Sequence, residues 1–181
     1  MDDTEKPLPG QGPTLEALVV DDETDVRDLL AEHLRARAVA VTALDGGRAA
    51  VALITRAPAR FALVVTDLLL PDVDGLAVLR AARAANPSCA VVIVTGYASL
   101  PSAIEAVRLG AYDYLTKPFS LGQIDVVLQR LRERHALEAE NRRLLWQLGR
   151  RPEDAAAGRL MQRLDGIEAR LARIETLLKP R

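Results

Sequence analysis

The chain has 181 residues, of which 49% are hydrophobic and 27% charged, and its formal net charge is −1. This length allows one ordinary domain with a buried core and an appendage of about fifty residues. No apolar run approaches the length of a membrane span, and the acidic start lacks the basic end and apolar stretch of a signal peptide. These features exclude a membrane protein and favour a cytoplasmic one.

Charge is distributed unevenly along the chain. Residues 1–14 hold three acidic residues and one basic residue, and they predict a disordered acidic tail. Residues 15–129 hold fourteen acidic and ten basic residues, whereas residues 130–181 hold eight acidic and thirteen basic residues. The C-terminal appendage therefore differs in kind from the body of the protein.

Short apolar runs alternate with longer segments of helical period through residues 15–130. The predicted strands are "ALVV" (17–20), "VAVTA" (39–43), "FALVV" (61–65), "AVVIV" (90–94) and "DYL" (113–115). Apolar runs without alternation indicate strands that are covered on both faces. Between the strands, apolar residues recur at intervals of three and four residues. This spacing predicts amphipathic helices within residues 24–37, 46–57, 73–86 and 99–110. The pattern predicts an α/β domain, a (βα)5 doubly wound parallel sheet of order 2-1-3-4-5.

Two serines have the spacing of a capping box. Ser102 is followed at three residues by Glu105, and Ser120 is followed at three residues by Gln123. Each pair predicts the start of a helix.

Polar side chains follow four of the predicted strands. Asp21 and Asp22 come after the first strand, Asp67 after the third, Thr95 after the fourth and Lys117 shortly after the fifth. Ligands of open parallel sheets collect outside the carboxyl ends of the strands. We therefore expect three carboxylates, one hydroxyl and one ammonium to converge at one edge of the sheet.

Three crowded carboxylates repel one another and would raise the pKa of at least one of them. Magnesium would relieve this repulsion, because it prefers oxygen ligands and commonly uses one or two carboxylates together with a substrate phosphate. The two histidines, His33 and His135, lie in helical segments without cysteine or histidine partners, which argues against a zinc site. An aspartate beside Mg2+ and a lysine can attack phosphorus and form an aspartyl phosphate. The sequence therefore predicts phosphoryl chemistry at this edge.

Four motifs carry a resemblance to a known family. In order along residues 15–130, "VVDDE", "VVTDLLLPDVDGL", "VTGYAS" and "AYDYLTKPF" resemble the signature blocks of the receiver domain of bacterial two-component response regulators. The receiver and the segment after it are similar to those of sigma-54-dependent transcription activators, but the ATPase and DNA-binding domains of that class are absent from these 181 residues. The resemblance implies a phosphorylated signalling protein, with a sensor histidine kinase as its partner.

The resemblance also implies roles for the carboxylates. Asp67 would be the phosphoacceptor, and Asp21 and Asp22 the acidic pair that holds Mg2+, with Asp22 as the direct ligand. The main-chain carbonyl of Leu69 would complete the protein's share of the metal shell. The family is not one of enzymes in the ordinary sense, so we expect only self-phosphorylation and slow self-dephosphorylation.

The remaining implied roles belong to the switch. Thr95 would be the switch hydroxyl, Tyr114 the switch aromatic residue and Lys117 the cation that contacts the phosphate, with a cis peptide bond between Lys117 and Pro118. For Tyr114, simple packing at the edge of the sheet is the alternative.

The last predicted helix continues beyond the domain, over residues 131–148. Leu137, Asn141, Leu144 and Leu148 follow spacings of four, three and four, which would place an asparagine at an a position of a coiled coil. A frayed, charged helix end is the alternative. Residues 149–158 then interrupt the pattern, with Pro152 as the helix breaker.

A heptad pattern returns over residues 159–179. Its apolar positions are Leu160, Leu164, Ile167, Leu171, Ile174 and Leu178. Leucine at a with isoleucine at d favours trimers or tetramers over dimers. Arginines at g and glutamates at e favour parallel strands. The pattern predicts a homo-oligomer formed by a parallel coiled coil, and an amphipathic helix that packs on its neighbour is the alternative.

Three functions remain open from the sequence. The first is a response regulator whose phosphorylation controls oligomerisation, or binding of an effector protein, through the C-terminal extension. The second is a transcription regulator whose basic tail contacts DNA or polymerase, although no pattern of a sequence-specific DNA reader is present. The third is an intermediate in a phosphorelay.

Overall fold

The computed structural model describes residues 15–147. Strands and helices alternate through this part of the chain, in the manner that the apolar runs predict. In chain order the elements are β1 (Glu16–Val20), α1 (Thr24–Arg35), β2 (Ala40–Leu44), α2 (Gly47–Arg56), β3 (Leu63–Asp67), α3 (Gly75–Ala85), β4 (Ala90–Thr95), α4 (Leu100–Arg108), β5 (Asp113–Thr116) and α5 (Leu121–Gln147).

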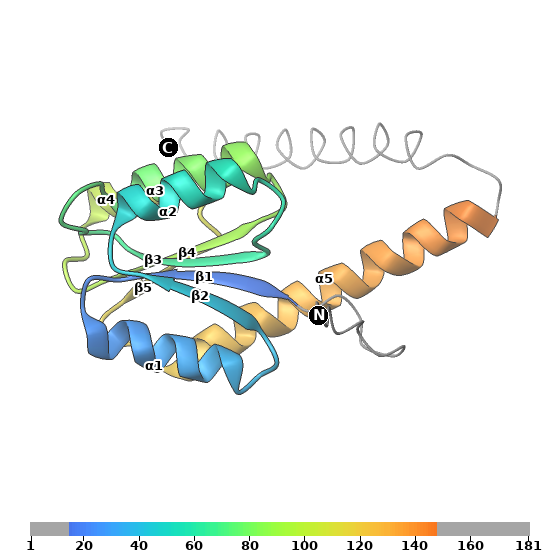
Figure 1. The fold of residues 1–181 in the computed structure, drawn as a ribbon, viewed down its shortest axis with the longest axis horizontal. Coiled ribbons are helices and arrows are strands. Elements are labelled where there is room, and N and C mark those ends of the chain that lie inside the picture. Colours follow the sequence, from blue (N-terminus) through green and yellow to red (C-terminus); the bar gives the residue numbers. More distant parts are fainter. Residues whose placement is uncertain (1–14, 148–181) are drawn as a thin grey trace, which may run out of the picture. The chain divides into compact units, whose positions relative to one another are not determined.

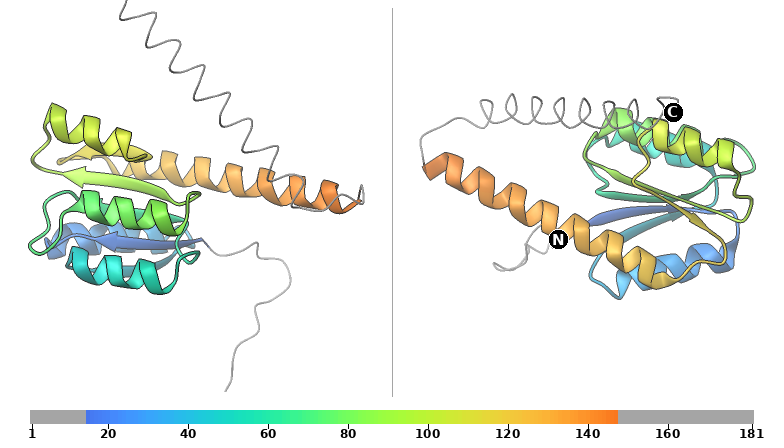
Figure 2. Two further views of the ribbon diagram at one scale, coloured as in Figure 1. Left: turned by 90° about the horizontal axis from the view of Figure 1, so that it is seen from above. Right: turned by 180° about the vertical axis from the view of Figure 1, so that it is seen from behind.

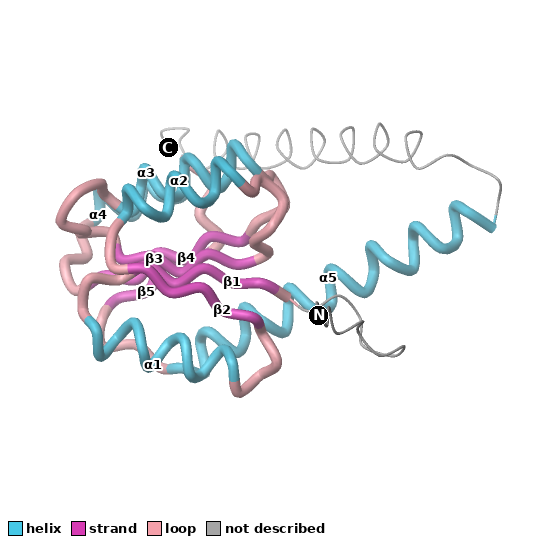
Figure 3. Tube along the Cα trace, in the orientation of Figure 1, coloured by secondary structure: helices cyan, strands magenta, loops and turns pink. Residues whose placement is uncertain are grey.

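All pairs of neighbouring strands are parallel, and the strand order is β2-β1-β3-β4-β5. Helices α2, α3 and α4 cover one face of the sheet, and α1 with residues 121–127 of α5 covers the other (Figures 1 and 3). The predicted fold class and strand order are confirmed. Figure 2 shows the same layers from above and from behind.

The central strands are buried because helices cover them on both sides. Every residue of β3 and β4 is buried, which explains why each strand begins with a continuous apolar run rather than an alternating pattern. The core between the sheet and α2, α3 and α4 includes Cys89, which is buried. Burial there leaves Cys89 a packing residue.

Across the other face, α1 is joined to the start of α5 by a polar contact. His33 Nε2 lies 2.8 Å from Asp125 Oδ1, and the guanidinium of Arg37 also contacts this carboxylate. Burial acts to raise the pKa of Asp125, but the hydrogen bonds from Arg37 and His33 outweigh it and hold the pKa below its ordinary value. His33 therefore links α1 to the start of α5 through Asp125.

The start of α4 corrects one prediction. The helix begins at Leu100 with Ser99 as its N-cap, so Ser102 is the third helical residue and not the cap, and the predicted pairing of Ser102 with Glu105 is wrong. Ser99 Oγ accepts from the Ser102 N–H at 3.2 Å, and Ser102 Oγ accepts from the Ser99 N–H at 3.3 Å. The capping box thus lies one turn earlier, with serine in the place that glutamate or glutamine usually takes.

The second capping prediction is confirmed. Gln123 Oε1 accepts from the Ser120 N–H at 2.9 Å, and Ser120 Oγ accepts from the Gly122 N–H at 3.2 Å. The two side chains satisfy donors that the first turn of α5 would otherwise leave without partners.

Helix α5 extends for 27 residues and ends at Gln147. The chain divides into two compact units within this helix, the first ending at Val127 and the second beginning at Leu128. In the second unit, Leu137 and Leu144 are 72% and 48% exposed, and Asn141 is exposed as well. The predicted heptad residues from Leu148 to Leu178 lie outside the described part. No helix within residues 15–147 is long and apolar enough to cross a membrane.

Candidate functional site

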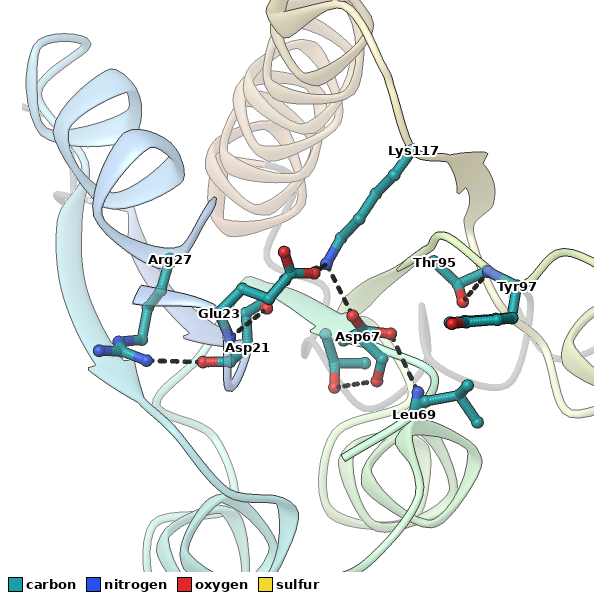
Figure 4. A network of polar contacts seen from close by, with 9 residues as sticks. Asp21, Glu23, Arg27, Asp67, Leu69, Thr95, Tyr97 and Lys117 are labelled. Atoms are coloured by element: carbon teal, nitrogen blue, oxygen red, sulfur yellow. Dashed lines mark hydrogen bonds and ion pairs between the residues drawn. The ribbon is translucent and has the colours of Figure 1, made fainter. Parts of the chain in front are cut away.

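The carboxyl ends of the central strands bring polar residues together at one edge of the sheet. Asp21 directly follows β1, Asp67 and Thr95 are the last residues of β3 and β4, and Lys117 follows β5. Because β1, β3, β4 and β5 are successive neighbours in the sheet, Asp21, Asp67 and Lys117 meet over the strand ends, and Thr95 lies to one side of them (Figure 4). The ends of β1 and β3 and the residue after β5 thus place two carboxylates and the ammonium in a single cluster.

Lys117 is the centre of this cluster. Its Nζ lies 2.7 Å from Asp67 Oδ2, 3.0 Å from Asp21 Oδ2 and 2.7 Å from Glu23 Oε1. The lysine side chain is only 14% exposed. Burial acts to lower the pKa of Lys117, but hydrogen bonds to Asp67, Glu23 and Asp21 outweigh it and hold the pKa well above its ordinary value. The ammonium therefore remains charged at neutral pH.

Asp21 is almost completely buried, at 1% exposure. The Glu23 N–H donates to its Oδ1 at 2.9 Å, and Arg27 donates to its main-chain carbonyl at 2.8 Å. Its Oδ2 lies 3.0 Å from Lys117 Nζ, at ion-pair distance. Burial raises the pKa of Asp21, although Lys117 and the Glu23 N–H oppose the shift. This oxygen is a buried acceptor whose close positive partner is the Lys117 ammonium.

Three carboxylates can hold a metal ion. Oxygen atoms of Asp21, Asp22 and Asp67 all lie within 4.8 Å of one another. A hard divalent cation would fit this set because all the donors are oxygens, and it would offset the repulsion among the three carboxylates. Beside them the Leu69 N–H donates to Asp67 Oδ1 at 2.9 Å, which ties the main chain of the next loop to the third carboxylate.

The two predicted switch residues lie near this cluster but hydrogen-bond elsewhere. Thr95 is fully buried, and its Oγ1 accepts from the Tyr97 N–H at 3.1 Å. The hydroxyl of Tyr114 lies 3.0 Å from Ser102 Oγ in the first turn of α4. Thr95 is thus engaged with the segment that joins β4 to α4, and Tyr114 with the first turn of α4. The peptide bond from Lys117 to Pro118 is cis, as the resemblance implied.

Two participants were not singled out from the sequence. Glu23 contributes a carboxylate to Lys117 although its own side chain is 61% exposed, and Ser102 holds the hydroxyl of Tyr114. Glu23 directly follows the Asp21-Asp22 pair in the sequence, and this position indicates that its carboxylate can lie close to the site. Ser102 gave no separate signal, because its spacing to Glu105 pointed to a helix cap.

The chain is similar to known proteins over this same region. Residues 17–129 match the family described as the response regulator receiver domain. The response regulator protein PilR of Pseudomonas aeruginosa is 39% identical over 125 residues, which cover 68% of this chain and 27% of PilR. The regulatory protein AtoC of Escherichia coli is 32% identical over 127 residues, which cover 70% of this chain and 27% of AtoC. The chain thus matches less than a third of the length of these relatives.

Solved structures show the same similarity. The receiver domain of a LuxO repressor protein from Vibrio parahaemolyticus superposes with a TM-score of 0.62 and 26% identity, covering 70% of this chain and 96% of that one. NtrX from Brucella abortus superposes with a TM-score of 0.61 and 33% identity, covering 73% of this chain and 30% of NtrX.

Proposed function

Because this chain belongs to the receiver domain family of two-component response regulators, we propose that it is a switch whose Asp67 accepts a phosphoryl group from a partner sensor histidine kinase. The observation that carries the proposal is the position of the Lys117 ammonium, 2.7 Å from Asp67 Oδ2 and 3.0 Å from Asp21 Oδ2. A buried cation held against an aspartate can neutralise an incoming phosphoryl group at that carboxylate.

The metal would be Mg2+, held by the side chains of Asp21, Asp22 and Asp67 and by the carbonyl of Leu69. When bound, it neutralises charge on the phosphoryl oxygens. Asp67 supplies the attacking oxygen, which forms a bond to phosphorus while the bond from phosphorus to the donor nitrogen of the kinase histidine breaks. Lys117 keeps one contact with the phosphoryl group and orients it. The protein's own contribution is position and charge, and it turns over no other substrate.

The phosphoryl group would then change the contacts of Thr95 and Tyr114. Thr95 Oγ1 now accepts from the Tyr97 N–H, and rotation of its hydroxyl toward a phosphoryl oxygen would release that amide. Tyr114 would fill the space that Thr95 vacates, and the hydroxyl of Tyr114 would leave Ser102. Phosphorylation of Asp67 would in this way change the contacts at the start of α4.

Phosphorylation itself is tested with an acyl phosphate donor and the full chain. We expect the wild type to gain the mass of one phosphoryl group in the presence of Mg2+ and to gain none after chelation. Asp67→Asn removes the acceptor oxygen and should gain none under either condition, as read by intact mass spectrometry. Uptake of a phosphoryl group by Asp67→Asn would place the acceptor elsewhere and overturn the assignment.

The contact between Ser102 and Tyr114 should appear as an energetic coupling. Tyr114→Phe and Ser102→Ala each remove one partner, so the double variant should be less destabilised than the sum of the two single variants, by about 1 kcal/mol. Urea unfolding of the four proteins measures this coupling. Ser99→Ala is the matched control, because it breaks the α4 capping box without touching the tyrosine; additive effects of Ser102 and Tyr114 would contradict the prediction.

The output would be made by the C-terminal extension, through oligomerisation or docking of an effector protein. Helix α5 continues to Gln147, and its second unit exposes Leu137, Asn141 and Leu144 at the spacing of a coiled-coil seam. The heptad pattern of residues 159–179 supports the same proposal. Light scattering should show an oligomer for the full chain and a monomer after removal of residues 158–181. The same number of subunits in the two proteins would refute self-association through this segment.

A second candidate function rests on charge. Residues 130–181 carry thirteen basic and eight acidic residues, which would support weak contact with the phosphate backbone of DNA. Binding of the full chain to duplex DNA that weakens steeply as salt is added would favour a role in transcription. Absence of binding at low salt would remove this candidate and leave protein interactions as the output.

A further inference from the structure

Helix α2 begins without a cap from its own chain neighbours. Gly46, the residue before the helix, has no side chain to accept a hydrogen bond, so the first N–H groups of the helix need partners from elsewhere. Asp72, from the loop between β3 and α3, supplies them. Its Oδ1 accepts from the Gly47 N–H at 2.9 Å and its Oδ2 accepts from the Arg48 N–H at 3.0 Å.

The loop and the start of α2 are in direct backbone contact at this point. A Cβ added to Gly47 would lie 2.2 Å from the carbonyl oxygen of Val73, and one added to Gly46 would lie 3.1 Å from Asp72 Oδ2. The Val73 N–H also donates to Asp72 Oδ1 at 2.8 Å. Gly46 and Gly47 therefore allow the loop to approach the start of α2, and the hydrogen bonds of Asp72 hold it there.

The other end of the same loop is fastened to Asp67. The Leu69 N–H donates to Asp67 Oδ1 at 2.9 Å, and the Gly75 N–H donates to the Leu68 carbonyl at 2.9 Å. Asp74, the other acidic residue of the loop, has a different task, since its Oδ1 caps α3 through the Ala77 N–H at 2.7 Å. The segment that holds Leu69 is thus fixed on one side by Asp67 and on the other by Asp72.

We propose that Asp72 is a positioning residue for the metal and phosphate site, because its hydrogen bonds to the start of α2 hold the loop that presents the Leu69 main chain beside Asp67. The inference rests on the proposed function, in which the Leu69 carbonyl is a metal ligand. Removal of a residue that hydrogen-bonds to the groups holding a metal ligand in place commonly lowers metal affinity by about tenfold or more. Asp72 touches neither the metal nor the phosphoryl group and acts through the backbone.

If Asp72 were only a helix cap, with no link to the site, its removal would have a different effect. Loss of a cap lowers stability, but in the folded protein it would leave the affinity for Mg2+ unchanged. Metal affinity measured on folded protein therefore separates the two roles, and Asp74 provides a control from the same loop because it also caps a helix.

The experiment titrates MgCl2 into the full chain and follows the backbone amide signals of residues 67–70 by NMR. Asp72→Ala should raise the Kd for Mg2+ by about tenfold, and Asp72→Asn, which keeps one acceptor oxygen, should fall between it and the wild type. Asp74→Ala should keep the wild-type Kd although it lowers the melting temperature. Slower phosphorylation of Asp72→Ala at subsaturating Mg2+ should follow, with the wild-type rate regained at saturating Mg2+.

Wild-type affinity in folded Asp72→Asn and Asp72→Ala would overturn the proposal and leave Asp72 a helix cap. An equal loss of affinity in Asp74→Ala would overturn it as well, since any disturbance of the loop would then suffice. If Asp72→Ala does not fold, Asp72→Asn decides the question alone. Wild-type protein that binds no Mg2+ would instead refute the proposed function, so the two failures are distinguishable.

Discussion

Replacement of Lys117 by arginine is expected to leave Mg2+ binding nearly unchanged but to abolish the response of the Tyr114 region to phosphorylation. The ammonium of Lys117 lies within 3.0 Å of carboxylate oxygens from Asp21, Asp67 and Glu23, in a space where the side chain is only 14% exposed. A guanidinium keeps the positive charge, but it is broad and planar and cannot occupy the position of a compact ammonium among these oxygens. The charge balance at the metal would persist, whereas the contact that orients the phosphoryl group would be lost.

Beryllium fluoride, which mimics the phosphoryl group, makes this prediction measurable. NMR spectra of the wild type should change around Thr95 and Tyr114 when the mimic is added with Mg2+, and spectra of Lys117→Arg should change only near the metal. Lys117→Met is the matched control, because it removes the charge as well and should bind Mg2+ more tightly than either protein. A complete response in Lys117→Arg would mean that charge alone suffices.

Gly75→Ala is expected to destabilise the domain by about 3 kcal/mol, at the upper end of what overpacking costs. A Cβ at Gly75 would lie 2.1 Å from the carbonyl oxygen of Asp67 and 3.0 Å from Leu68 Cα, so the backbone that follows β3 would have to move. The Gly75 N–H also donates to the Leu68 carbonyl at 2.9 Å, which the displacement would break.

Gly96→Ala is the control for this prediction. Gly96 also follows a strand of the site edge, but an added Cβ there would meet no atom within 4 Å, and the expected change is about 0.5 kcal/mol or less. Urea unfolding of both variants without metal measures the difference. Equal stabilities for the two variants would show that the loop after β3 yields at little cost.

The sheet and its site edge could be predicted because both follow from local patterns. Strands β3 and β4 are buried throughout, and each begins with an uninterrupted apolar run. The residues that come after each run must then lie at the carboxyl edge of a parallel sheet. The convergence of Asp21, Asp67 and Lys117 needed only the strand order in addition to these runs.

The contacts that escaped prediction join segments that have no pattern in common. Asp72 caps α2 from 25 residues further along the chain, and nothing in "LPDVDG" shows which helix its carboxylate serves. Glu23 reaches Lys117 with a long and largely exposed side chain. Ser102 was assigned to the wrong place in its helix because serine with glutamate three residues later resembles a cap, whereas Ser99 and Ser102 form the actual capping box.

The helices that cover the sheet differ in how much of each is buried. Five residues of α3 are buried, namely Gly75, Leu76, Val78, Leu79 and Ala82, whereas Ala106 alone is buried in α4. Leu100, Ile104 and Val107 of α4 are 45% to 74% exposed. Local opening costs least where few apolar side chains are buried. The sheet and α3 are therefore expected to resist local opening, whereas α4 should open more easily. Amide hydrogens in α4 should exchange sooner than those in α3.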